Sequence, residues 1–301
     1  MGGTYPGYFG PCTRKTFAWA FGRGGPARWS MLKTIQLNVK NVETMLRQPA
    51  DVYETILFDP NLDCNLQCVY CHIPRLDGVV KADALRQFIE QNVIRVNQFQ
   101  VGCAMEPTLD PRLGDLMLMI SRSPAKPVYS FRLQTNGTLL KRHDPGKFRD
   151  AGLSEVTVSI DSADPEVQKA LRGGTSLAEV AADLEWFQKA CPLVVIKFIT
   201  TVTTKNVNGM ADLIDFGINL GVTRFVFREM FYYPNNRFVD HSRMPALVLP
   251  DGAFSRMKEC VSAKFGGRVR LHFWEASTLV DIAKTVLNDS LMPGPSSPPL
   301  G

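Results

Sequence analysis

Long hydrophobic runs are missing from this sequence of 301 residues. No apolar stretch approaches the roughly 18 residues that a membrane-spanning helix needs, and the opening MGGTYPGYFGPC lacks the basic-then-apolar order of a secretory signal. The chain also has no block of five like charges, and 34 Lys and Arg against 29 Asp and Glu give a formal net charge of +5. We therefore expect a cytoplasmic protein with no membrane partner, and the charge balance permits a nucleic-acid partner without indicating one.

The composition is not extreme in any direction. Hydrophobic residues make up 45% of the chain and charged residues 21%, both near the averages of folded globular proteins. The composition therefore disfavours the disordered, collagen-like and coiled-coil classes. The length suits one large α/β domain or two ordinary ones.

From Tyr53 onward, short β-branched or aromatic runs alternate with longer helical stretches, and no shorter repeat is superimposed on them. This alternation is typical of parallel strands joined by crossover helices. It predicts strands over residues 53–59, 98–103, 128–134, 155–160, 193–202 and 224–229, with a seventh over 269–273. It predicts helices over residues 82–96, 112–121, 143–151, 177–190, 210–220 and 253–264.

The two ends of the chain differ from this pattern. Residues 1–50 hold a Gly-rich aromatic segment, GRGGPARW, and an amphipathic stretch over 35–47, and we expect them to form an N-terminal extension without an assigned role. Residues 51–290 are expected to form the α/β barrel with its C-terminal elements. The last residues, 291–301, are rich in Pro, Gly and Ser and are expected to be disordered, because they cannot bury enough apolar area.

Successive side chains of a strand point to opposite faces, so each predicted strand has two faces. One face is apolar, and the other carries polar residues, namely Arg132, Gln134, Thr157, Ser159, Asp161 and Lys197. The apolar faces must lie under the helices, which leaves the polar faces toward the space that the sheet encloses. A closed eight-stranded barrel fills that space with branched apolar side chains. We therefore predict a partial (β/α)6 TIM-like barrel around a polar ligand; the alternative is a flat sheet with a solvated polar face.

Three of the seven cysteines lie within eight residues, in the run DCNLQCVYCHIPR directly after the first predicted strand. An odd, unevenly spaced set in a long chain indicates metal binding in a reducing compartment rather than disulfide bonds. Cys64, Cys68 and Cys71 are separated by three and then two residues, so one loop can surround three corners of an iron–sulfur cubane. Since four thiolates complete such a ligand set, three leave one iron open, as a catalytic cluster requires.

Two other metal sites use the same cysteines. A structural zinc site would add His72 or Cys103, but His72 directly follows Cys71, and zinc loops usually come as paired C-x2-C halves. A ferredoxin-like cluster would take Cys103 as its fourth ligand. Either alternative would make the chain a non-catalytic iron–sulfur or zinc-binding protein.

The C-x3-C-x2-C spacing, with aromatic Tyr70 before the third cysteine, resembles the signature loop of radical S-adenosylmethionine (radical SAM) enzymes. The resemblance implies that Cys64, Cys68 and Cys71 hold a [4Fe-4S] cluster whose fourth iron is chelated by SAM. It places Tyr70 near the adenine. It also implies reduction by a ferredoxin or flavodoxin, cleavage of SAM, and hydrogen abstraction from a substrate by the 5'-deoxyadenosyl radical.

Further segments resemble SAM-binding stretches of the same family. GCAMEPTLDP resembles the Gly-Gly-Glu-Pro segment that takes the methionine amino group, which implies this role for Glu106, although Ala104 and Met105 replace the usual glycines. QTNGT resembles a ribose-facing turn, and VSIDS with LRGGTS resembles the serine and arginine that meet the SAM carboxylate and ribose. These resemblances imply SAM contacts for Gln134, Asn136, Ser159, Asp161 and Arg172.

Several of these residues also have a purely structural interpretation. Asn136 can simply take the positive φ of a turn, and Asp161 can cap a helix near Pro165. Lys197 lies mid-strand in the enclosed interior, where a lysine must find an acidic partner or lose its charge. Asp161, Glu229 or a ligand carboxylate are the candidates, and a structural ion pair is the alternative to a catalytic role.

The substrate is expected at the C-terminal ends of the strands. The sixth strand ends in REMFYYPNNR, which places Arg228, Glu229, Tyr232 and Tyr233 at that rim. Two opposite charges beside two aromatic rings suit a zwitterionic or polyhydroxy ligand. We therefore expect Arg228 and Glu229, together with Lys197, to act in catalysis.

The C-terminal part of the chain bears on the substrate class. The only cysteine after Cys191 is Cys260, so we expect no cysteine-rich auxiliary-cluster domain. We also expect no leader-peptide-binding module, because no separate segment is large enough to form one. We favour hydrogen abstraction from a small natural-product or peptide substrate. An RNA-modifying enzyme is the alternative, and it would predict a basic surface stripe.

Overall fold

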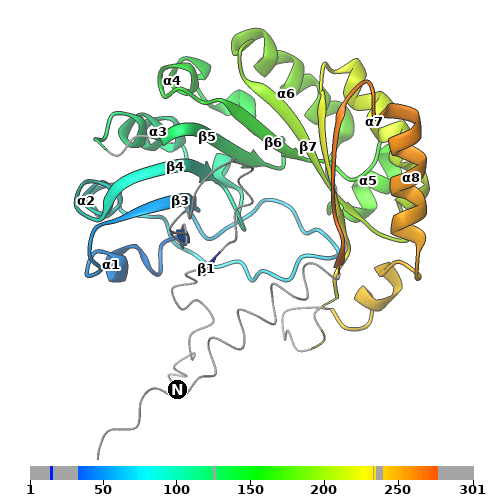
Figure 1. Ribbon diagram of the computed structural model, residues 1–301, viewed down its shortest axis with the longest axis horizontal. Coiled ribbons are helices and arrows are strands. Elements are labelled where there is room, and N and C mark those ends of the chain that lie inside the picture. The colour runs from blue at the N-terminus through cyan, green and yellow to red at the C-terminus, as the bar shows by residue number, and fades with distance from the viewer. Residues whose placement is uncertain (1–13, 16–32, 125–126, 233, 235–239, 277–301) are drawn as a thin grey trace, which may run out of the picture.

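The sheet is the feature that organises this computed structural model, which describes residues 14–15, 33–124, 127–232, 234 and 240–276. Nine strands follow one another across the sheet in sequence order, from β1 to β9. Strands β2 to β9 are parallel to their neighbours, whereas the short β1 (Arg14–Lys15) pairs with β2 in the antiparallel sense. Figure 1 shows the sheet as an arc with helices along its outer side. The expected α/β partial barrel is thereby confirmed.

Each pair of consecutive parallel strands is connected through at least one helix, as parallel pairing requires. The parallel strands are β2 (Lys33–Leu37), β3 (Asp51–Phe58), β4 (Val93–Val101), β5 (Pro127–Thr135), β6 (Glu155–Ser159), β7 (Val195–Val202), β8 (Arg224–Glu229) and β9 (Arg270–Trp274). The α-helices are α1 (Val42–Met45), α2 (Ala82–Asn92), α3 (Leu113–Ser121), α4 (Pro145–Asp150), α5 (Pro165–Leu171), α6 (Leu177–Ala190), α7 (Met210–Asn219) and α8 (Ala253–Phe265). Single 3-10 turns are η1 (Pro107–Leu109), η2 (Leu140–Arg142), η3 (Val207–Gly209) and η4 (Met244–Leu247).

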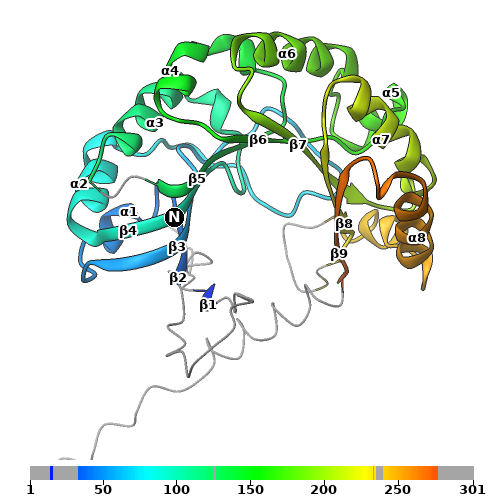
Figure 2. The same cartoon turned by 45° about the horizontal axis from the view of Figure 1, so that its top comes forward.

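The two faces of the strands differ as their alternation predicts. The helix-facing side chains are at most 4% exposed and include Ile56, Phe58, Phe99, Val101, Phe131, Leu133, Val156, Val158, Ile196, Phe198, Phe225 and Phe227. Arg132, Gln134 and Lys197 alternate with them and stay partly exposed. Figure 2 shows the sheet curving, with its helices on the convex side. The flat-sheet alternative is therefore wrong, and the polar residues lie on the concave side.

The N-terminal edge of the sheet contains a strand that the sequence did not suggest. Residues 33–37 form β2, which pairs with β3, and the helix α1 follows directly. Ile35 and Leu37 alternate as in a strand, whereas Val42 and Met45 are spaced as in a helix, and all four are at most 5% exposed. The two periods together imitate one amphipathic stretch, which explains why the strand was missed.

One predicted helix boundary is wrong. The helix expected over 82–96 ends at Asn92, and the chain continues without a loop into β4. The segment VIRV is rich in β-branched side chains, which favour a strand and outweigh the helical spacing.

The helices form the outer layer of the partial barrel (Figure 1). Among the described residues, no helix has both the length and the apolar character needed to span a bilayer. The tail predicted over 291–301, together with Cys12 and Tyr233, lies outside the described residues.

Candidate functional site

The cysteine-containing loop joins β3 to α2 and starts at the C-terminal edge of the parallel sheet. Cys64 and Cys68 are partly buried, and Cys71 is exposed. The backbone N–H of Cys71 donates to the carbonyl of Cys68 at 3.0 Å, so the chain turns tightly between them. Besides burial, the charge of Cys71 raises the pKa of both Cys64 and Cys68, so the three thiols are neighbours. One loop therefore brings the three predicted ligands together.

The chemistry of these thiols fits an iron–sulfur cluster. Burial raises the pKa of Cys64, and it raises that of Cys68 to about 11, although nearby Arg172 acts in the opposite direction. Thiolates are the metal-binding form, so metal binding here releases protons. Among the described residues, no three His, Cys, Asp or Glu side chains converge on a single ion. A cubane cluster needs no such convergence, because each thiolate ligates a different iron. A tetrahedral zinc site does need it, because all its ligands bind one ion.

Hydrogen bonds from distant parts of the chain hold this loop. Asn136 Nδ2 donates to Asn65 Oδ1 at 2.8 Å, and Asn65 Nδ2 donates to Thr138 Oγ1 at 2.9 Å. The backbone N–H of Val69 donates to the carbonyl of Leu171 at 3.0 Å. The loop is thus anchored both to the segment after β5 and to the end of α5.

The loop also reaches across the end of the arc toward β8 (Figures 1 and 2). His72 shows this proximity, because burial and the charge of Arg228 both lower its pKa. Tyr70 packs at the edge of a small apolar cluster formed by Leu171, Met230, Met244 and Leu247. The cysteine loop therefore covers the C-terminal end of the concave side.

A buried triad of Tyr70, Asp161 and Arg172 joins the loop to the end of β6. The Tyr70 hydroxyl donates to Asp161 Oδ2, and Arg172 Nη1 donates to that hydroxyl at 2.6 Å. The Asp161 carboxylate lies 3.7 Å from Arg172 Nη1, and its other oxygen accepts from the Thr201 N–H at 2.9 Å. Burial raises the pKa of Tyr70 well above its ordinary value, so the hydroxyl keeps its proton.

Arg172 carries an unused donor. Its side chain is 10% exposed, and its Nε is buried with no hydrogen-bond partner among the described residues. Burial disfavours the charged guanidinium, but Tyr70 and Asp161 outweigh burial and raise its pKa well above the ordinary value. Arg172 is therefore a permanent cation with a free donor beside the cysteine loop.

Asp161 is not a helix cap, so this structural alternative is wrong. The N-cap of α5 is Asp164, whose Oδ1 accepts from the Glu166 N–H at 2.8 Å and from the Val167 N–H at 3.1 Å. Asp161 is 0% exposed, and its carboxylate is used by Tyr70 and Thr201.

Asp59, which the sequence pattern did not single out, holds the backbone of the segment after β4. Its Oδ1 accepts from the N–H groups of Cys103 at 2.8 Å, Ala104 at 3.1 Å and Met105 at 3.3 Å. Gln36 Nε2 on β2 donates to Oδ2 at 3.1 Å. Its position directly after a strand, where barrel sites lie, was the signal available in the sequence.

Glu106 is 2% exposed, and its carboxylate accepts four hydrogen bonds from within the protein. It accepts from the N–H and the hydroxyl of Thr108 at 3.1 and 2.5 Å, from the Thr135 hydroxyl at 2.6 Å and from the Asn136 N–H at 2.6 Å. Burial raises its pKa, and these hydrogen bonds oppose the rise. Glu106 therefore ties the segment after β4 to the segment after β5.

The other predicted SAM contacts lie at the same end of the barrel. Gln134 Oε1 accepts from Gln100 Nε2 at 3.3 Å, and Ser159 is partly exposed at the end of β6. The positive φ in the following turn belongs to Gly137, at +80°, and not to Asn136. The positive φ expected for Asn136 is therefore wrong. Its side chain accepts from the Thr138 N–H at 3.0 Å within the turn and also holds the cysteine loop through Asn65.

Arg228 and Glu229 end β8 on opposite faces of the sheet. Glu229 continues the helix-facing series of Phe225 and Phe227, and its Oε2 accepts from the Ala276 N–H at 2.7 Å. Arg228 faces the concave side, where burial lowers its pKa, although the nearby Asp161 carboxylate acts in the opposite direction. The expectation that both charges face one ligand is corrected, because neighbouring residues of a strand cannot share a face.

Tyr232 lies at the same rim. Its hydroxyl is 2.6 Å from His241 Nδ1, and its ring packs on the apolar cluster that Tyr70 also touches. Tyr232 and Tyr70 of the cysteine loop therefore pack on the same cluster.

Lys197 has an acidic partner that was not among those expected. Its Nζ lies 2.6 Å from Glu155 Oε1. Arg132 and Arg224 contact the same carboxylate at 3.5 and 3.0 Å. We call these four residues the Glu155 cluster; it lies on the concave side, toward the N-terminal ends of the strands.

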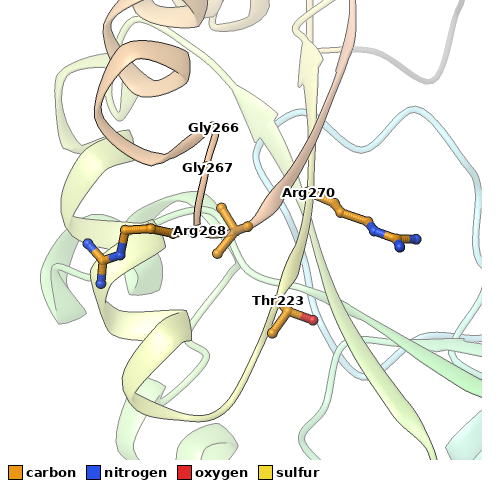
Figure 3. A pocket seen from close by; sticks show the side chains of 6 residues that line it. Thr223, Gly266, Gly267, Arg268 and Arg270 are labelled. Carbon is orange, nitrogen blue, oxygen red and sulfur yellow. The ribbon is translucent and has the colours of Figure 1, made fainter.

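A hollow of about 310 Å³ lies elsewhere on the molecule (Figure 3). It is lined by Thr223, Gly266, Gly267, Arg268, Val269 and Arg270. These residues precede β8 and β9 or, in the case of Arg270, begin β9, so the hollow is at the opposite ends of the strands from the cysteine loop. It is therefore not the candidate catalytic site.

Comparison with known proteins finds a family match over the segment that contains the cysteine loop. The family model described as the Radical SAM superfamily matches residues 60–217. A probable GTP 3',8-cyclase of Sulfolobus acidocaldarius is 31% identical over 190 residues, which cover 60% of this chain and 58% of the relative. A probable GTP 3',8-cyclase of Methanococcus aeolicus is 29% identical over 164 residues, which cover 53% of this chain and 54% of the relative. The chain thus spans a little over half the length of these curated relatives.

Solved structures share the fold. SuiB of Streptococcus suis bound to S-adenosylmethionine aligns with a TM-score of 0.56 and 17% identity, covering 73% of this chain and 50% of that chain. The protein anSMEcpe with bound AdoMet and the Cp18Cys peptide aligns with a TM-score of 0.55 and 20% identity, covering 74% of this chain and 63% of that chain. At these identities the likeness concerns the fold.

Proposed function

This chain belongs to the radical SAM superfamily, and on that premise we propose that it cleaves SAM reductively and abstracts a hydrogen atom from a small-molecule or peptide substrate. The observation that carries the proposal is one juxtaposition. The loop with Cys64, Cys68 and Cys71 lies at the same end of the barrel as Arg172, whose Nε is buried without a partner among the described residues.

Cys64, Cys68 and Cys71 would hold a [4Fe-4S] cluster, which would supply the electron for the reductive cleavage of SAM. The protein would orient the substrate carbon toward the SAM end of the barrel and keep water away, because the difficult chemistry belongs to the cofactor. We assign the electron supply to a ferredoxin or flavodoxin and the location to the cytoplasm, where a reducing compartment keeps the three thiols free.

Arg172 is the group that we assign to the SAM carboxylate. A carboxylate beside its Nε would satisfy the unused donor with a charge-assisted hydrogen bond. Tyr70 and Asp161 hold the guanidinium from the other side, so they orient it before SAM arrives. Ser159, partly exposed at the end of β6, is assigned to the same carboxylate.

The remaining SAM contacts follow from the placement of the loops. Gln134 lies near the end of β5 and Asn136 directly follows that strand; we assign both to the ribose, and Tyr70 to the adenine. Asp59 and Glu106 fix the backbone around the segment that resembles the amino-group site. We assign to Glu106 the positioning of that segment, since its carboxylate is already used by four donors.

We assign the substrate to the concave side of the sheet, nearer the N-terminal ends of the strands than SAM. Lys197 and Arg228 face this side, and we assign to them substrate binding in catalysis; Glu229 faces the helices. The curated relatives are named for a reaction of GTP, and one solved neighbour holds a peptide. Because the match covers 58% of the first relative, we carry over the radical chemistry and argue the substrate from this chain's own interior.

The test is anaerobic reconstitution with iron and sulfide, followed by reduction in the presence of SAM. We expect about four irons per chain and release of 5'-deoxyadenosine. Cys68→Ala should lose both. The matched control is Cys260→Ala, which removes an exposed thiol on α8, outside the cysteine loop, and should keep both. Zinc uptake without iron, or iron uptake without SAM cleavage, would refute the proposal.

A further inference from the structure

The concave side of the sheet carries more positive than negative charge near the N-terminal ends of the strands. Arg132 on β5, Lys197 on β7 and Arg224 on β8 all contact the carboxylate of Glu155 on β6. Arg132 Nε also donates to the Ser130 hydroxyl at 2.7 Å, which fixes its guanidinium against the sheet. Three cations therefore share one anion, which leaves two positive charges without a partner in the cluster.

The exposure of the four side chains shows which of them a ligand would meet. The Glu155 side chain is 6% exposed, whereas those of Arg132, Lys197 and Arg224 are 29%, 17% and 34% exposed. Burial opposes ionisation of Glu155, but its three basic neighbours outweigh burial and hold its pKa below the ordinary value. The carboxylate is thus charged and covered, while the cations remain reachable from the concave side.

Arg270 extends this charge to β9. It pairs in register with Arg224, so the two side chains share the concave face, and it is exposed. Figure 3 shows Arg268 and Arg270 leaving the chain in opposite directions, with Arg270 pointing away from the turn at the end of α8. A ligand on the Glu155 cluster therefore has a further arginine at its side.

We propose that the Glu155 cluster and Arg270 bind the phosphate group of the substrate, an inference that rests on the proposed function. A phosphate monoester carries about 1.5 to 2 negative charges at pH 7, which matches the two unpaired charges of the cluster. A single carboxylate would leave one of them unbalanced. Guanidinium groups bind phosphate oxygens through paired hydrogen bonds, and an ammonium group adds a point charge.

The spacing along β7 agrees with a small phosphorylated substrate. Lys197 lies four residues before Thr201, whose N–H binds Asp161 of the triad. Four strand residues span about 13 Å. A phosphate held at Lys197 therefore leaves the other end of a small molecule close to the SAM end of the barrel.

The experiment is calorimetric titration of the full chain with inorganic phosphate, in the absence of iron, SAM and reductant. We expect binding that Lys197→Met and Arg224→Met each weaken about tenfold, the usual effect of losing one charge-assisted contact. Glu155→Gln, which adds one net positive charge, should tighten it. Lys264→Met, which removes an exposed cation paired with Asp215 on the helical side, is the control and should bind like the parent.

Two outcomes would overturn the inference. One is phosphate binding that is absent in the parent or equal in the parent, Lys197→Met and Arg224→Met, with each variant shown to be folded by thermal unfolding. The other is acetate binding as tightly as phosphate, which would mean a site for any anion. If Glu155→Gln fails to fold, the two cation variants decide. Since the titration uses no iron and no SAM, its result is independent of the test of SAM cleavage.

Discussion

Arg172 Nη1 donates to the Tyr70 hydroxyl at 2.6 Å, although the two residues are 102 positions apart in the sequence. Tyr70 directly precedes the third cysteine of the loop, and its hydroxyl also binds Asp161 at the end of β6. The cysteine loop and the residue assigned to the SAM carboxylate are therefore one connected unit. Arg172 is not itself among the three cysteines assigned to the cluster, so a variant at Arg172 tests SAM binding separately from cluster binding.

Arg172→Ala should keep the iron and weaken SAM binding. The loss of one charge-assisted contact costs about 1.5 to 3 kcal/mol, or roughly ten- to a hundredfold in affinity. Iron analysis and equilibrium binding of SAM to the reconstituted protein measure the two properties. The control is Arg86→Ala, an exposed arginine on α2, which should change neither. SAM affinity unchanged in Arg172→Ala would refute this assignment.

Gly173→Ala should lower the iron content of the reconstituted protein. Gly173 has φ +64°, and a Cβ there would lie 2.5 Å from the carbonyl oxygen of Gln67 in the cysteine loop. Gly174 has φ +97°, but a Cβ there would meet nothing within 4 Å. Alanine at either position costs about 1 to 2 kcal/mol for a left-handed backbone, so Gly174→Ala is the matched control. Equal iron contents in the two variants would contradict the packing of this turn on the loop.

Asp59→Ala should destabilise the protein and weaken SAM binding together. It removes the acceptor of three backbone N–H groups after β4, which costs about 2 to 4 kcal/mol if these donors stay buried. Urea denaturation and SAM titration measure the two effects. Asp59→Asn keeps one acceptor oxygen and should lie between the parent and Asp59→Ala, and Asp251→Ala on the exposed surface should match the parent. Full SAM affinity in a folded Asp59→Ala protein would exclude this positioning role.

The stability contributed by Glu155 should depend on pH. Its folded pKa is held below the ordinary value of 4.5 by its basic neighbours. The contribution is therefore fully present above the unfolded pKa and is lost as the pH falls through the folded pKa. Glu155→Gln should lower the free energy of unfolding by about 1 to 3 kcal/mol at pH 7, and this gap should narrow below pH 4.5. A gap that stays constant from neutral pH to about pH 3 would contradict the ion pairs.

Local regularities of the sequence predict the barrel and the cysteine loop. The two-residue period of β5, β6 and β7 assigns apolar side chains to the helices and polar ones to the concave side, and burial agrees. The spacing of Cys64, Cys68 and Cys71 lies within one loop, so it needs no knowledge of distant contacts. Such features depend only on residues that are close together in the sequence.

Contacts between residues on different strands could not be predicted from the sequence. The partner of Lys197 is Glu155, because β6 and β7 pair in a register that sets Lys197 opposite Thr157 and diagonal to Glu155 on the same face, and no local pattern encodes a register. Asp59 was missed for a related reason, since its partners belong to the segment after the neighbouring strand. Strand β2 was missed because its period merges with that of the helix that follows it.

Electron paramagnetic resonance of the reduced, reconstituted protein, with and without SAM, tests most directly whether Cys64, Cys68 and Cys71 leave one iron of a [4Fe-4S] cluster open to SAM. We predict a cluster signal that changes in shape when SAM is added, in the parent and in Cys260→Ala. The signal should be absent from Cys68→Ala. A signal that saturating SAM leaves unchanged would contradict the open iron.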